Sequence, residues 1–115
     1  MKLMNIYGCN DVPDILNEWN CAASVEERPS AYAAAASLAF MLGMQKRSPS
    51  VLCYYDARIG ASVYGGMFNP DTHTPYKTYY SFVSFNSLYK LENEIETSSD
   101  DENLYVGGAA KDGKK

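Results

Sequence analysis

The residues best suited to chemistry in this 115-residue chain lie in the run Asp14-Ile15-Leu16-Asn17-Glu18-Trp19-Asn20. Its apolar stretch predicts a short buried strand, with Glu18 at the strand's end between two amide side chains and an indole. A carboxylate in this setting suits the cleavage of a glycosidic bond, in which it attacks the anomeric carbon. We therefore interpret Glu18 as a candidate nucleophile. The alternative is that Glu18 is an exposed loop carboxylate, the usual fate of a glutamate.

Helices and a second strand follow this run in alternation. Ser30 to Met44 is rich in alanine and predicts a helix. The near-continuous apolar run Val51 to Tyr55 predicts a strand buried on both faces. Arg58 to Thr74 is a long loop with three glycines and one proline, and Pro75 to Leu91 predicts a second helix. The alternation indicates an α/β fold with parallel strands.

Local signals mark where several of these elements begin. Ser24 and Glu27 have the spacing of a capping box, and Pro29 suits a first helical turn. Gly8 is expected to end a helix that runs through Tyr7.

The C-terminal part is predicted to be less regular. Residues 92–103 are acidic and polar and predict an exposed linker. Leu104-Tyr105-Val106 predicts a short strand, and Asp112-Gly113 is typical of a hairpin turn.

Composition narrows the classes of function. The net charge is −4 and the sequence has no basic stripe, so we expect no nucleic-acid partner. The three cysteines and the single His73 have no metal-ligand spacing, so we expect no metal and no cofactor. No apolar run is long enough to predict a membrane span. The compartment stays open.

The order of these motifs is similar to that of a known enzyme family. The strand ending in Asn17-Glu18-Trp19-Asn20, the segment Tyr64 to Phe68 and the helix start Thr74 to Phe82 resemble the C-terminal end of a retaining clan A glycoside hydrolase. The resemblance is strongest to glycoside hydrolase family 39, the β-xylosidase and α-iduronidase family. It covers roughly residues 1–110, nearly the whole chain, and two of the eight βα units of a barrel enzyme.

The resemblance implies a fold and a set of roles. It implies strands seven and eight of a (β/α)8 barrel in residues 1–91, a linker in 92–103, and the first strand of a truncated β-sandwich in 104–115. Glu18 is then the nucleophile. The implied carbohydrate contacts are Asn17, Trp19, Tyr55, Asp56 and Tyr64.

The sequence departs from the family's pattern at two places, and two of the implied contacts have alternative roles. Tyr55 stands where the family usually has a tryptophan beneath the sugar. An Asn-Glu pair is also typical of the clan's acid/base glutamate, but only one further βα unit follows Glu18, which assigns it to strand seven. Trp19 has the alternative of packing against the barrel rim, and Asp56 that of pairing with Arg58.

The same interpretation leaves the site incomplete. The sequence offers no second glutamate at a strand end, so we expect the isolated chain to be inactive and its partner to be the N-terminal part of the barrel or another copy of itself. The alternative function is a small non-catalytic α/β module that binds a partner or a carbohydrate.

Overall fold

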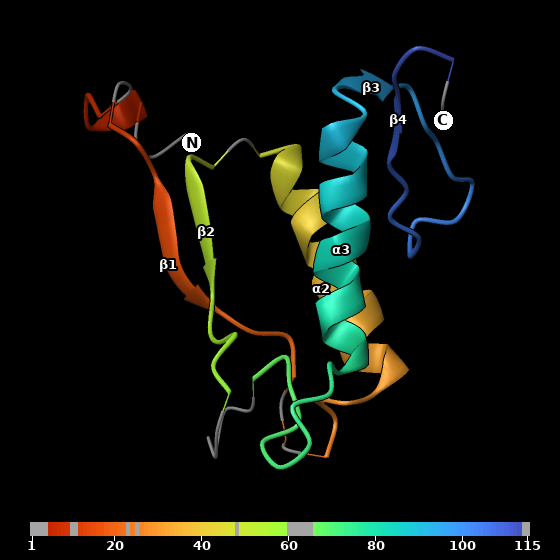
Figure 1. The fold of residues 1–115 in the computed structure, drawn as a ribbon. Coiled ribbons are helices and arrows are strands. Elements are labelled where there is room, and N and C mark those ends of the chain that lie inside the picture. Colours follow the sequence, from red (N-terminus) through yellow and green to blue (C-terminus); the bar gives the residue numbers. More distant parts are fainter. Residues whose placement is uncertain are drawn as a thin grey trace.

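The computed structural model describes residues 5–9, 12–22, 24, 26–47, 49–59 and 66–113. These residues form strand β1 (Ile15–Trp19), helix α2 (Ala31–Gln45), strand β2 (Val51–Tyr54), helix α3 (Lys77–Lys90), and strands β3 (Asn93–Ile95) and β4 (Gly108–Ala110). Strands β1 and β2 are parallel, and both helices run back in the opposite direction (Figure 1). The predicted α/β class is confirmed as a βαβα unit followed by a strand pair.

Helix α2 begins and ends close to the predicted bounds. Ser30 is its N-cap, and the Ser30 hydroxyl accepts a hydrogen bond from the Ala33 amide at 3.1 Å. The predicted capping box lies one turn too early: the Glu27 amide donates to Ser24 Oγ at 3.3 Å, but this bond closes a turn before the helix. Pro29 belongs to that turn and not to the first turn of α2.

Helix α3 packs along α2. The Ser81 hydroxyl donates to the Ala34 carbonyl at 2.7 Å, and the Thr78 hydroxyl donates to the Arg28 carbonyl at 3.2 Å. Both α3 side chains are buried and small, so the two helices approach closely. The helix begins two residues later than predicted, because Pro75 forms an isolated β-bridge with Phe68.

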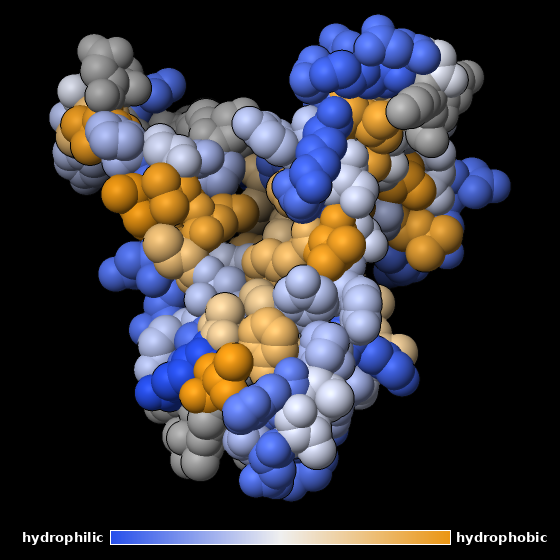
Figure 2. Space-filling model, viewed as in Figure 1, coloured by the Kyte–Doolittle hydropathy of each residue, from blue (hydrophilic) through white to orange (hydrophobic). Residues whose placement is uncertain are grey.

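The β1–β2 sheet is covered by the helices on one face only. Leu52 and Tyr54 alternate along β2 with the exposed Val51 and Cys53. The prediction of a strand buried on both faces is therefore wrong for the described residues, since none of them covers the second face. Figure 2 shows apolar residues at the surface over the strands.

The C-terminal part forms a strand pair and not a linker followed by a lone strand. Strand β3 lies inside the predicted linker and pairs antiparallel with β4, with Glu94 opposite Ala109. The predicted strand at Leu104–Val106 is wrong, because these residues belong to the connection between β3 and β4. The pair lies on the side of the helices away from the β1–β2 sheet (Figure 1).

Both turn signals coincide with observed turns, and the return strand of the predicted hairpin lies outside the described residues. Asp112 and Gly113 both have positive φ, 48° and 78°, as a type I′ turn requires. Gly8 has φ 72° and its amide donates to the Asn5 carbonyl, as expected for a helix stop.

Candidate site at the strand ends

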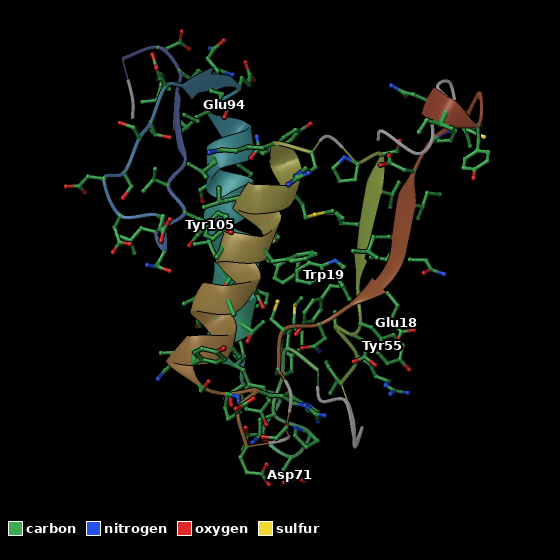
Figure 3. All side chains as sticks on the ribbon, turned by 180° about the vertical axis from the view of Figure 1, so that it is seen from behind. Glu18, Trp19, Tyr55, Asp71, Glu94 and Tyr105 are labelled. Carbon is green, nitrogen blue, oxygen red and sulfur yellow. The ribbon has the colours of Figure 1, made fainter. Side chains whose placement is uncertain are left out.

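An irregularity in β1 determines where Glu18 points. Leu16 pairs with Leu52 and Trp19 pairs with Tyr54, so two residues of β1 lie opposite Cys53 alone. Such a bulge reverses the alternation of side chains beyond it. Trp19 therefore turns toward the helices, and its neighbour Glu18 turns to the open face. Glu18 is exposed there, at the C-terminal end of the strand (Figure 3).

Trp19 lies in the core of the molecule. Its side chain is 8% exposed and its ring lies 4.6 Å from Phe40 of α2, 5.0 Å from Tyr54 and 6.0 Å from Phe82 of α3. The indole Nε1–H has no hydrogen-bond acceptor among the described residues, so packing alone holds the ring. This position fits the packing alternative and leaves no ring face open to a sugar.

Asn20 fastens the ends of the two strands together. Its Nδ2 donates to the Tyr55 carbonyl at 2.7 Å, and its Oδ1 accepts from the Ala22 amide at 2.7 Å. The Tyr55 amide donates in turn to the Trp19 carbonyl at 2.9 Å. These bonds fix the backbone that carries Glu18 relative to the backbone that carries Tyr55.

Tyr55 and Asp56 follow β2 at the same end of the sheet. The Tyr55 ring is half-buried and lies at the strand ends with Glu18 (Figure 3), and the Tyr55–Asp56 peptide bond is cis. The Asp56 carboxylate forms an ion pair with Arg58 at 3.1 Å. In this structure Asp56 therefore pairs with Arg58, which was the alternative to a carbohydrate contact.

Of the remaining predicted contacts, one is exposed on β1 and one lies outside the described residues. Asn17 is exposed in the irregular part of β1. Tyr64 lies outside the described residues. Phe68, in the same loop, packs its ring against Tyr79, with the ring centroids 5.4 Å apart. His73 is exposed, with φ 58° in a turn that Asn69 closes.

A partly buried polar group beneath the strand ends was not predicted. Burial raises the pKa of the Tyr54 hydroxyl, which a hydrogen bond to the Asn20 side chain partly offsets. Burial also raises the pKa of the Cys21 thiol. The one sequence feature that pointed to this polar group is Asn20 itself, which belongs to the run that carries Glu18 and follows it by two residues.

Comparison of the chain with family models, with curated proteins and with solved structures finds no match. Among the described residues, no three His, Cys, Asp or Glu side chains lie close enough together to hold a metal ion. None of the described helices combines the length and apolar character of a membrane span.

Proposed function

We propose that this chain carries the seventh and eighth βα units of a retaining glycoside hydrolase barrel, with Glu18 as the nucleophile. The observation that carries the proposal is the position of Glu18 on the sheet face opposite the helices, at the C-terminal ends of two parallel strands. Barrel enzymes gather their catalytic side chains at this end of the strands. The face away from the helices is the one that lines a barrel's interior.

The secondary structure supports the same proposal. A parallel pair joined by a helix, with a second helix after β2, is the repeating unit of such a barrel. The exposed Ile15 and Val51 side chains, 58% and 44% exposed, lie on the face that a closed barrel would bury. The assignment of residues 104–115 to a β-sandwich stays a prediction, with β4 as its strand.

The chemistry needs Glu18 and one further carboxyl. In the first step a Glu18 oxygen attacks the anomeric carbon and the bond to the leaving group breaks. A second carboxylic acid normally protonates the leaving oxygen, at about 5–5.5 Å from the nucleophile. Asp56 forms an ion pair with Arg58, so we do not assign it the role of this acid. The proposal places the second carboxyl on another segment. Tyr55 takes the role of sugar platform in place of Trp19.

Covalent labelling tests the nucleophile without the missing acid. Fluoride leaves with its electron pair and needs no proton, so a 2-deoxy-2-fluoro-β-xylosyl fluoride can form an ester with a lone nucleophile. We expect one glycosyl adduct on wild-type chain, mapped to Glu18 by peptide mass spectrometry. Glu18→Gln should give none, and the matched variant Glu94→Gln should label as wild type does. An adduct that survives in Glu18→Gln would contradict the assignment.

The alternative function is a non-catalytic α/β module, and the exposed apolar residues of the sheet favour it as a binding surface. Such a module would bind its partner or a xylo-oligosaccharide with no covalent adduct. Unlabelled wild type together with saturable binding in calorimetry would favour this second candidate.

A further inference from the structure

The connection between β3 and β4 carries a serine with an unusual charge environment. Its segment Thr97-Ser98-Ser99-Asp100-Asp101-Glu102 places hydroxyl side chains directly before a run of carboxylates. None of the residues 96–107 belongs to a helix or a strand, and residues 96–105 are all exposed. The same residues include no lysine or arginine, so the connection itself offers its carboxylates no cation. The connection runs on the side of the helices away from the β1–β2 sheet (Figure 1).

Local hydrogen bonds shape the connection around Ser99. The Ser99 hydroxyl oxygen accepts a bond from the Asp101 amide at 3.1 Å. The Leu104 amide donates to the Asp101 carbonyl, also at 3.1 Å. All three residues are exposed, so water can replace these bonds at little cost in free energy. The segment can therefore open into an extended chain that presents the Ser99 hydroxyl to another protein.

Ser24 provides an internal comparison, because it too stands three residues before a glutamate. Ser24 is half-buried, and its hydroxyl accepts a hydrogen bond from the Glu27 amide at 3.3 Å. This bond closes the turn that leads to Ser30, the N-cap of α2. Extension of that segment would break the turn, so the structure keeps Ser24 engaged and leaves Ser99 accessible.

The two hydroxyls before Ser99 are less suitable. The Thr97 hydroxyl donates to the Val106 carbonyl at 3.4 Å and so joins the two ends of the connection. Ser98 is followed first by Ser99, an uncharged residue. Ser99 alone is followed by carboxylates at each of the next three positions.

We propose that Ser99 is a phosphorylation site for a serine/threonine protein kinase with a basic substrate groove. Cationic side chains of that groove pair with Asp100, Asp101 and Glu102 and so select this serine, as charge patterns do between kinases and their substrates. The proposal does not depend on the role of Glu18.

The reaction is a phosphoryl transfer from ATP. The Ser99 oxygen attacks the γ-phosphorus, and an O–P bond forms while the bond from that phosphorus to the β–γ bridging oxygen breaks. ADP leaves with the electron pair of the broken bond. The hydroxyl proton passes to the catalytic aspartate of the kinase.

Incubation of the full chain with ATP, Mg²⁺ and an acidic-directed casein kinase tests the proposal. We expect wild type to gain one phosphate by intact mass, mapped to Ser99 by peptide fragmentation, and Ser99→Ala to gain none. Glu102→Gln should lower the initial rate by about fivefold, the factor that one exposed charge pair can contribute. Glu96→Gln, with the same change of charge before the serine, is the matched control and should react at the wild-type rate.

Two further controls separate recognition from mere exposure. An arginine-directed kinase should leave wild type unmodified, and Ser24→Ala should still gain its phosphate on Ser99. Circular dichroism of each sample should show unchanged helices. A wild-type chain without phosphate, a phosphate that remains in Ser99→Ala, or an unchanged rate in Glu102→Gln would overturn the proposal.

Discussion

The two faces of the β1–β2 sheet differ in what their residues do. On the helix-facing side, Trp19 and Tyr54 join Phe40 and Phe82 in an aromatic core. On the other side, Glu18 is exposed among apolar side chains that no described residue covers. The bulge in β1 decides which residue takes which face, since it turns Trp19 inward and Glu18 outward. Two neighbours in one motif therefore lie in different environments, Trp19 in the aromatic core and Glu18 on the open face.

Substitution of Trp19 should have the largest effect. Trp19→Ala removes the centre of the aromatic core and should lower the free energy of unfolding by about 3–5 kcal/mol, measured by urea denaturation. Glu18→Gln, on the open face, should change it by less than about 0.5 kcal/mol. Similar losses from both variants would show that the two faces do not divide the roles.

Loss of the Ser81 hydroxyl should have an intermediate effect. Ser81→Ala removes the hydrogen bond to the Ala34 carbonyl between the helices and should cost about 1 kcal/mol. Ser84→Ala, at an exposed position of the same helix, is the matched control and carries the same change in helix propensity. If both variants unfold at the same urea concentration, the bond between the helices contributes nothing.

Tyr54 should make the core face sensitive to alkaline pH. Its pKa is raised by burial, so the folded state holds the phenol proton more tightly than the unfolded state does. This contribution to stability is present below about pH 10 and is lost as the pH rises through the folded pKa. Ultraviolet titration should show a late tyrosine ionisation step. In Tyr54→Phe that late step should be absent, and its persistence would assign it elsewhere.

Asp14 should give the smallest effect, at acidic pH. The Ser50 amide donates to the Asp14 carboxylate at 2.9 Å and lowers its pKa. The stabilisation is present above about pH 4 and is lost as the pH falls through the folded pKa. Unfolding midpoints of wild type and Asp14→Asn should therefore converge between pH 5 and pH 2.5, within roughly the range where carboxylates titrate. Parallel curves would contradict this.

Much of the fold was predictable because local signals dominate it. Alanine content and Ser30 define α2, and the apolar run from Val51 defines β2. The C-terminal pair was missed because β3 lies in an acidic segment that has no strand pattern and forms through long-range pairing with β4. Strand preference depends on such neighbours more than on the residues themselves.

The candidate site was predictable in position but not in detail. The run around Glu18 identifies the strand end, but a periodic pattern cannot reveal a bulge that depends on pairing with β2. The period of a strand places the neighbours Trp19 and Glu18 on opposite faces, but the sequence gives no sign of which face each one takes. The role of Asn20 also depends on a carbonyl 35 residues away.

The most direct test of the central claim is the site of the glycosyl adduct after treatment with the 2-fluoro-xylosyl fluoride. The account predicts one adduct per chain, on Glu18, that forms in Glu94→Gln and is absent from Glu18→Gln. An unlabelled wild-type chain, or an adduct on another carboxylate, would contradict the claim that the open face of the sheet carries a nucleophile.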